Sequence, residues 1–471
     1  MRHRLFLFLF CVLLSAAFGS VRAQDEEVLI ITAPQPLARL SGEVEVIGTV
    51  NPPGLRSYFL EVADFVENPD TAVWTPVSLP QRAPVINGLI ARFSTTAIPD
   101  GVYALRLRAV LEGGETLTLL VRPLRVDNAS AVPTPEPTPE GPPIVPRPQV
   151  VNELPIPVGG QLDNFDENAA RLMRAAGMTW IKWQIPFVVG DFSLIDVARD
   201  RINWSHERGF YAMLSIKGLR DELAALGADY YPLYAEFVGR VAELGVDAIQ
   251  VWNEQNIDRE WPTGRISPAA YTELLRQAYT AIKAVDETIL VITGSPAPTG
   301  AEGAFGLERV WNDDRYYQGM AAAGAANYAD CIGIHYNEGI VPPSATSGDP
   351  RDNYPTRYFP TMLQRAAAPF RAQGMPLCFS ELGYISPDGF GRLPASFAWG
   401  QNNTVQQQAA WLRDAIRIAA ETPTVQVDLI IIFNVNFTRF VENDPQAAFA
   451  IIRPDGSCPA CATIAELRQP R

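Results

Sequence analysis

Residues 247–254 read Asp-Ala-Ile-Gln-Val-Trp-Asn-Glu, a short apolar run that ends in an asparagine and a glutamate. A second run, Pro-Leu-Cys-Phe-Ser-Glu, spans residues 376–381. Both runs are rich in apolar or β-branched residues and are bounded by Gly or Pro, a pattern typical of buried β-strands. Each carries a carboxylate where its strand should stop. The sequence therefore predicts that Glu254 and Glu381 end two strands of one sheet.

Six further strand candidates follow residue 150, and helix-patterned segments lie between them. The eight candidates are residues 157–162, 179–185, 211–216, 248–252, 289–293, 331–335, 377–380 and 427–433. Helical patterns cover segments such as residues 167–176, 231–244, 268–285 and 405–420. Eight strands alternating with helices over about 320 residues predict an α/β fold, a (β/α)8 TIM barrel. A doubly wound sheet is the alternative, but no Gly-x-Gly-x-x-Gly turn follows the first strand.

The N-terminus has the pattern of a secretory signal peptide, residues 1–23. Arg2 and Arg4 precede an apolar stretch, residues 5–17, and residues 21–23 read Val-Arg-Ala, a small-residue cleavage site. A membrane anchor is the alternative, but the stretch is short for a span, and no later stretch approaches the ~20 apolar residues that a spanning helix needs. The protein is therefore predicted to be secreted or held at the cell surface, without a membrane span.

Residues 25–127 show period-two patterning in several short segments, which are residues 43–50, 57–62, 89–93 and 102–110. About seven short strands over ~100 residues fit an immunoglobulin- or fibronectin-like β-sandwich. The segment resembles modules attached to bacterial exported enzymes. Residues 128–149 are rich in Pro and Thr and are predicted to form an extended linker to the barrel of residues 150–471.

The formal charge of −14 provides no basic surface, which argues against a nucleic-acid partner. Beyond the signal, His206 and His335 are the only histidines, and no second Cys pair accompanies Cys458-Pro-Ala-Cys461. A zinc or redox motif is therefore disfavoured, and no metal or cofactor is expected. The oligomeric state is left open.

Four cysteines remain after removal of the signal. Cys331 and Cys378 fall in candidate neighbouring strands, where small buried thiols are common. Cys458 and Cys461 are predicted to be either a local disulfide or two plain thiols.

Two facing carboxylates are the minimum equipment for hydrolysing a glycosidic bond. Side chains at the carboxyl ends of barrel strands share one mouth, so Glu254 and Glu381 are predicted to meet there. In a retaining enzyme the two groups lie about 5–5.5 Å apart; one protonates the leaving oxygen and the other attacks the anomeric carbon. The acid needs a raised pKa, and the nucleophile must stay ionised.

The motif Trp252-Asn253-Glu254 follows one β-run, and Glu381 ends a later one. This arrangement resembles clan A of the glycoside hydrolases, which are retaining (β/α)8 enzymes, and within the clan it is most similar to families 39 and 5. The resemblance extends over residues 150–471 but depends on a few short motifs. It implies that Asn253 contacts a sugar 2-hydroxyl, that Glu254 is the acid/base and that Glu381 is the nucleophile.

The same resemblance implies that His335 and Tyr336, at the end of the sixth strand, steady the nucleophile or bind sugar. His335 could equally be a satisfied structural histidine. The chain departs from the clan at two strand ends. Gln184-Ile-Pro186 stands where an arginine turn is common, and Phe433-Asn434 stands where a tryptophan is common. Gln184 and Asn434 are taken as candidate substrate contacts at these positions.

Aromatic residues in loops are candidate platforms for sugar rings. Trp261 follows the Glu254 loop, and Trp399 lies in a Gly- and Pro-rich loop after the seventh strand. At least one of Trp180 and Trp183 is expected in the core. Residues 258–260, Asp-Arg-Glu, are interpreted as solvated loop charges.

The sequence thus predicts an exported retaining glycoside hydrolase that cleaves β-glycosidic bonds of a polysaccharide or oligosaccharide. The alternative is a non-catalytic carbohydrate-binding surface protein that keeps the barrel, which the two departures motivate. A metal-dependent barrel hydrolase is a further alternative, which the shortage of histidines disfavours.

Overall fold

The computed structural model describes residues 28–36, 38–65, 69, 72–128, 143–441 and 444–468. The predicted signal peptide, residues 1–23, and residues 129–142 of the predicted linker lie outside the described residues. The chain divides into two compact units whose boundary falls between residues 131 and 132.

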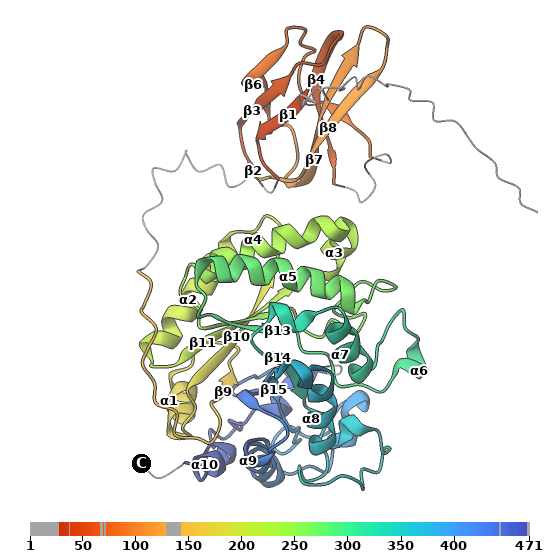
Figure 1. Ribbon diagram of the computed structural model, residues 1–471. Coiled ribbons are helices and arrows are strands. Elements are labelled where there is room, and N and C mark those ends of the chain that lie inside the picture. The colour runs from red at the N-terminus through yellow and green to blue at the C-terminus, as the bar shows by residue number, and fades with distance from the viewer. Residues whose placement is uncertain are drawn as a thin grey trace, which may run out of the picture. The chain divides into compact units, whose positions relative to one another are not determined.

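The first unit contains two β-sheets with an apolar core shared by both. One sheet has the order β1-β3-β6, and the other has the order β2-β8-β7-β4-β5 (Figure 1). The strands are β1 (Leu29–Ala33), β2 (Arg39–Leu40), β3 (Glu43–Val50), β4 (Leu55–Asp64), β5 (Thr75–Pro76), β6 (Val85–Ser94), β7 (Gly101–Leu111) and β8 (Thr116–Val126). Val46 of β3, Leu60 of β4 and Leu105 of β7 are fully buried in that core. The unit is therefore all-β, and its immunoglobulin-like or fibronectin-like character stays a prediction.

The second unit is built on eight parallel strands that nearly close into a barrel, which confirms the predicted α/β, TIM-like architecture. The strand order is β13-β12-β11-β10-β9-β16-β15-β14, and an isolated parallel bridge from Ile292 to Cys331 links the two ends. The strands are β9 (Val158–Gln161), β10 (Trp180–Phe187), β11 (Tyr211–Gly218), β12 (Ala248–Val251), β13 (Leu290–Thr293), β14 (Ile332–Tyr336), β15 (Leu377–Leu382) and β16 (Val427–Ile432).

Helices surround these strands in Figure 1. They are α1 (Glu167–Ala175), α2 (Ser193–Glu207), α3 (Arg220–Leu226), α4 (Tyr230–Ala242), α5 (Pro268–Val285), α6 (Glu302–Phe305), α7 (Asp313–Ala322), α8 (Phe359–Ala367), α9 (Val405–Glu421) and α10 (Pro459–Ala465). Side chains in the preceding loops begin several of them. Asp166 accepts hydrogen bonds from the first turn of α1, and Thr404 forms a capping box with Gln407 at the start of α9.

Side chains alternate along β10, so every second residue faces the barrel interior. Trp180 packs into an apolar cluster that fills the lower barrel, together with residues such as Met213, Ala248, Ile292 and Leu429. Lys182 and Gln184 lie on the same face of β10 as Trp180, two and four residues nearer the carboxyl end of the strand. The barrel interior is therefore apolar toward the amino ends of the strands and polar toward their carboxyl ends, where both glutamates lie.

The lower barrel also contains a disulfide between Cys331 and Cys378, with an S–S distance of 2.10 Å. The expectation of small buried thiols at these two positions was wrong. Cys331 lies two residues before Gly333, which pairs with Cys378 in the parallel register of β14 and β15, and the Cα atoms of the two cysteines are 5.9 Å apart. Of the two alternatives for the other pair, the disulfide is the one formed, with an S–S distance of 1.98 Å between Cys458 and Cys461.

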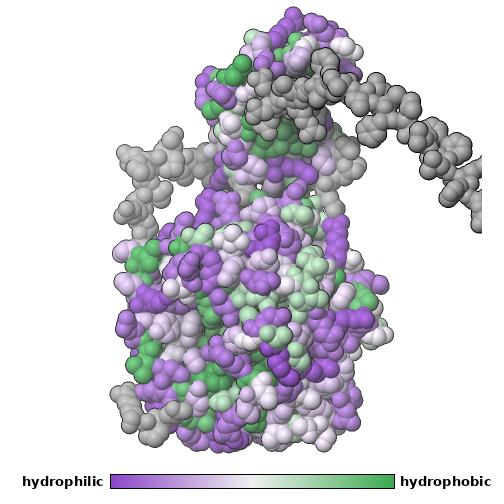
Figure 2. All heavy atoms as spheres, viewed as in Figure 1, coloured by the Kyte–Doolittle hydropathy of each residue, from purple (hydrophilic) through white to green (hydrophobic). Residues whose placement is uncertain are grey.

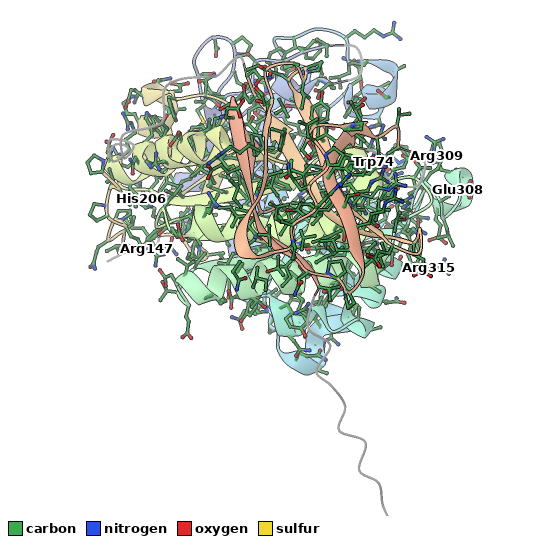
Figure 3. The ribbon with its side chains drawn as sticks, turned by 90° about the horizontal axis from the view of Figure 1, so that it is seen from above. Trp74, Arg147, His206, Glu308, Arg309 and Arg315 are labelled. Atoms are coloured by element: carbon green, nitrogen blue, oxygen red, sulfur yellow. A yellow bond between two sulfur atoms is a disulfide. The ribbon has the colours of Figure 1, made fainter. Side chains whose placement is uncertain are left out.

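Residues 143–150 run in extended conformation along the second unit. Arg147 pairs with Asp247 at 2.6 Å, and the two ring nitrogens of His206 lie 2.8 Å from the Val145 carbonyl and 2.7 Å from Asp247. Arg147 and His206 lie near one another in Figure 3. His206 therefore has a structural role: it joins the segment of residues 143–150, which precedes β9, to Asp247, directly before β12.

The face of the second unit seen in Figure 2 is mainly hydrophilic, with smaller apolar groups between the polar ones. Among the described residues, no helix is both long enough and apolar enough to cross a bilayer.

Candidate active site

Glu254 and Glu381 lie at the carboxyl ends of their strands. Glu254 follows β12 by three residues, and Glu381 is the next-to-last residue of β15. Their relative exposures are 9% and 7%, so both carboxylates are largely withdrawn from water. The backbone turns sharply after β12: Trp252 and Glu254 have φ values of 74° and 50°, which are uncommon for residues with a side chain. The Glu254 amide then donates to the Ser295 carbonyl at 2.9 Å.

His335, near the end of β14, lies between the two glutamates. Its Nδ1 atom is 3.3 Å from Glu254 Oε1 and 3.7 Å from Glu381 Oε2. Those two carboxylate oxygens are therefore at most 7.0 Å apart, the sum of the two distances. The structure thus brings together two acids that are more than a hundred positions apart in the chain.

A short chain of hydroxyls holds the other side of the His335 ring. Its Nε2 atom is 3.0 Å from Ser380 Oγ, which lies 2.6 Å from Ser295 Oγ. His335 is 1% exposed, so its orientation is determined by these partners within the barrel. The sequence pointed to His335 but not to either serine.

Glu254 is held as a carboxylate. Its Oε2 accepts a hydrogen bond from Arg259, and its Oε1 faces His335. Burial alone would raise the pKa of Glu254, but its interactions with His335, and then those with Arg259, outweigh burial and lower the pKa to about 2. This direction is opposite to the raised pKa expected of a general acid. Arg259, interpreted from the sequence as a solvated loop charge, is in fact paired with Glu254.

Glu381 has partners on both of its oxygens. Lys182 Nζ lies 3.1 Å from Oε1, and Asn337 Nδ2 donates to Oε2 at 3.3 Å. Neither residue was predicted from the sequence. A lysine within an otherwise apolar strand, Trp-Ile-Lys-Trp, is the signal that could have identified the first.

Asn253 precedes Glu254 and is 8% exposed. Its Oδ1 atom is buried and has no hydrogen-bond partner among the described residues. A buried amide oxygen without a partner is costly, so Asn253 is equipped to accept a hydrogen bond from a ligand hydroxyl. Gln184 is exposed on the interior face of β10, two residues beyond Lys182, which places it at the barrel mouth.

Three other predicted contacts point elsewhere. Tyr336 is 1% exposed and donates its hydroxyl to the Arg357 carbonyl, because alternation along β14 turns it away from the interior that His335 faces. Trp261 is 2% exposed and donates its indole N–H to the Arg265 carbonyl. The Asn434 amide donates to the Gln446 carbonyl at 2.8 Å and is fully buried. These three side chains are occupied by packing and by backbone hydrogen bonds.

Trp399 is half-buried beside Phe397 in the loop that follows β15, and the Arg351 guanidinium lies 4.9 Å from its ring centroid. It belongs to a partly buried aromatic cluster that also contains Phe433, the residue directly after β16. Its described ring contacts are with Phe397 and Arg351, so its substrate role stays a prediction.

A hollow of about 670 Å³ opens between the loops that follow β13 and β14. Its lining residues are Thr299, Gly300, Ala301, Glu338, Asp352, Asn353, Tyr354, Pro355 and Arg357. Neither Glu254 nor Glu381 lines this hollow; its nearest lining residue in sequence is Glu338, which directly follows Asn337, the residue that contacts Glu381. Burial raises the pKa of Glu338, and the charge of Arg357, with which it forms an ion pair, opposes that rise.

Within the described part of the chain, no group of three or more His, Cys, Asp or Glu side chains is arranged to hold a metal ion. The chemistry available at this site is that of two carboxylates, a histidine and two cationic partners.

A scan against models of protein families found no match, and a search among curated proteins found none. Solved structures similar to this chain include an endo-β-1,4-glucanase from Xanthomonas axonopodis pv. citri, with 14% identity over 66% of this chain and 98% of that chain and a TM-score of 0.44. A broad-specificity endoglucanase from Clostridium longisporum is 12% identical over 66% of this chain and 95% of that chain, with a TM-score of 0.45. A glucosidase from Croceicoccus marinus is 13% identical over 69% of each chain, with a TM-score of 0.45. Likeness at this level assigns the chain to no family, and its function has to be inferred from its own site.

Proposed function

We propose that the protein is a retaining glycoside hydrolase in which Glu381 is the nucleophile and Glu254 is the acid/base. The observation that carries the proposal is the pair of buried carboxylates at the barrel mouth, whose oxygens facing His335 are at most 7.0 Å apart. The separation typical of retaining enzymes, about 5–5.5 Å, lies within this limit, whereas most of the ~6.5–9.5 Å typical of inverting enzymes lies outside it.

The reaction takes two steps in this proposal. Glu381 attacks the anomeric carbon, the glycosidic C–O bond breaks, and the leaving oxygen takes a proton from Glu254. Water then attacks the glycosyl-enzyme, gives a proton to Glu254 and releases Glu381 as a carboxylate. Asn253 contributes its free amide oxygen to a sugar hydroxyl, and His335 keeps the two acids in register.

The first step requires a protonated Glu254, and this requirement is hard to meet because Arg259 and His335 hold Glu254 ionised. The Arg259 side chain is 70% exposed, so it can move away from Glu254 at little cost. A substrate that displaces Arg259 from the Glu254 carboxylate removes one of the two groups that lower its pKa. Glu254 can then be protonated where the leaving group needs it.

Arg259→Met is expected to raise kcat/KM at pH 5–6, because the pKa of Glu254 rises from about 2 and a larger fraction of the free enzyme has the acid protonated. The measurement is the pH profile of kcat/KM on an activated aryl β-glycoside. Arg417→Met, which removes an exposed helix-surface cation paired with Glu421, is the matched control and should leave the profile unchanged. A profile for Arg259→Met identical to that of the wild type would show that Arg259 does not restrain the acid.

The proposal is tested by trapping the covalent intermediate. Full-length protein is incubated with a panel of 2-deoxy-2-fluoro aryl β-glycosides, which slow the second step more than the first. Mass spectrometry of peptides should find one glycosyl group on Glu381, and NMR of early products from an ordinary substrate should show the β-anomer. An α-anomer as first product would disprove retention, and a label on another residue would disprove the assignment of Glu381.

The ion pair on Glu254 also favours a second candidate function, a carbohydrate-binding barrel without turnover. A carboxylate held permanently by Arg259 and His335 can accept hydrogen bonds from sugar hydroxyls but cannot donate a proton. Binding of oligosaccharides in calorimetry without release of reducing ends or aryl groups would support this function over hydrolysis.

Export is part of the proposal. Two disulfides, Cys331–Cys378 and Cys458–Cys461, support an oxidising compartment, in which such bonds persist. The signal-like N-terminus predicted from residues 1–23 agrees with it.

A further inference from the structure

Lys182 occupies a position in which a charged side chain is costly. It lies on the interior face of β10, one step above Trp180 in the apolar lower barrel, and it is 0% exposed. The whole chain contains three lysines among its 38 basic residues. An ammonium withdrawn from water needs a fixed counter-charge and hydrogen-bond acceptors, or it is not tolerated.

Both acceptors recorded for the ammonium lie on β15. Lys182 Nζ donates to the Ser380 carbonyl and to Glu381 Oε1, each at 3.1 Å. Strands β10 and β15 are not neighbours in the sheet, because β9 and β16 separate them. The lysine side chain therefore reaches past two strands through the barrel interior and contacts the consecutive residues Ser380 and Glu381 near the end of β15. Because one acceptor is the backbone next to Glu381 and the other is its carboxylate, the lysine fixes the orientation of the Glu381 side chain relative to its strand.

The two acids differ in how their cations are held. The cation beside Glu254 is Arg259, which is 70% exposed, whereas the cation beside Glu381 is fully buried. Among the described residues, Lys182 is the only lysine or arginine recorded within 4 Å of Glu381. Burial lowers the pKa of Lys182, and the charges of Glu381 and Glu254 partly restore it. The charged state of the lysine thus depends on the acids that it faces.

The geometry points to Lys182 as the positioning residue that orients Glu381 for attack and supplies its counter-charge. This inference rests on the proposed role of Glu381 as nucleophile. In the glycosyl-enzyme Glu381 is a neutral ester, so the ammonium loses its counter-charge within the barrel. When the C–O bond of that ester breaks, the electron pair returns to the Glu381 oxygen and the ion pair with Lys182 is restored. Lys182 therefore assists the second step as well as the first.

Lys182→Met is the direct test, because methionine keeps most of the apolar stem and removes the charge. On an aryl β-glycoside that the wild type cleaves, kcat/KM should fall by about 100-fold, as expected for a misplaced reacting group. The limb of the pH profile that reports Glu381 should move to higher pH by about one unit or more, since an opposite charge within ~4–6 Å favours the carboxylate. The other titratable groups that face Glu381 are His335 and, through it, Glu254 with Arg259, and they are unchanged in this variant. Lys283→Met, which removes a lysine paired with Asp330 outside the site, is the matched control and should alter neither quantity.

A limb that stays in place in Lys182→Met would overturn the inference, even if the rate falls, because a purely structural lysine would lower the rate without moving the limb. Glu381→Gln is assayed in parallel. If Glu381→Gln keeps its activity, the proposed function fails whatever Lys182 does; if it is inactive while Lys182→Met has a normal profile, only the inference fails.

A stability cycle provides a second measurement that needs no substrate. Lys182→Met, Glu381→Gln and the double variant are unfolded in urea and their midpoints compared. Each single variant leaves one buried group without its partner, so the double variant should be less destabilised than the sum of the two. If Lys182→Met does not fold alone, the double variant should still fold. Additive midpoints, or a double variant that also fails to fold, would overturn the pairing of Lys182 with Glu381.

Discussion

Exchange of Glu381 for glutamine is expected to lower kcat by about four orders of magnitude or more, with the fold retained. Glutamine has the same shape but cannot supply the electron pair that displaces the leaving group. It also gives Lys182 an amide oxygen where a carboxylate stood, so some stability is lost while the barrel remains intact. The measurement is turnover of an activated aryl β-glycoside, with circular dichroism and urea unfolding as checks of the fold.

Glu421→Gln is the matched control for this exchange, because it removes a glutamate from the exposed end of α9, where Glu421 pairs with Arg417. It should retain full activity. Wild-type turnover in Glu381→Gln would show that another group attacks the anomeric carbon.

Replacement of Glu254 by alanine is the second large effect. Without an acid/base, hydrolysis of an activated aryl glycoside should fall by about 100-fold or more, chiefly in the second step, because water then lacks a base. An aryl leaving group of low pKa departs with little help, so the glycosyl-enzyme still forms and accumulates. Azide occupies the space left by the carboxylate, needs no base and attacks the intermediate. We therefore expect azide to restore much of the aryl release.

The configuration of the azide product separates the roles of the two acids. Glu254→Ala should give a β-glycosyl azide, because two displacements occur. Glu381→Ala with azide should give the α-glycosyl azide, because a single displacement occurs. NMR distinguishes the two anomers. Identical anomers from both variants, or an absence of any rescue, would contradict the division of labour between Glu254 and Glu381.

The site accounts for both departures noted in the sequence. Where an arginine turn was expected at the end of β10, the chain has Gln184, and the cation beside Glu381 comes from Lys182, one inward-facing position earlier on the same strand. At the end of β16, Asn434 is buried and bonded to the backbone, and Phe433 belongs to an aromatic cluster over the loops. The chain thus differs from the expected pattern: other residues supply the charge and the packing around the two acids.

Short apolar runs bounded by turn residues were sufficient to predict the barrel, its eight strands and a glutamate at or just beyond the ends of β12 and β15, because these signals lie in neighbouring positions of the chain. The alternation of side chains along a strand also predicts that Tyr336 faces away from His335 and that Lys182 shares a face with Gln184. Both features are therefore encoded locally, although neither was predicted.

Other features depended on contacts that no local pattern encodes. The bond from Lys182 to Glu381 joins residues 199 positions apart, the His335 contact with Glu254 joins residues 81 apart, and Cys331 meets Cys378 only because β14 and β15 pair in one particular register. Trp261 reads as a loop aromatic in sequence, yet it is buried against Trp252. The chain on its own determined that two acids stand at strand ends. The fold decided that Lys182 of β10 meets Glu381 and that His335 of β14 meets both acids, because the strands that carry these residues are far apart in sequence and come together only in the barrel.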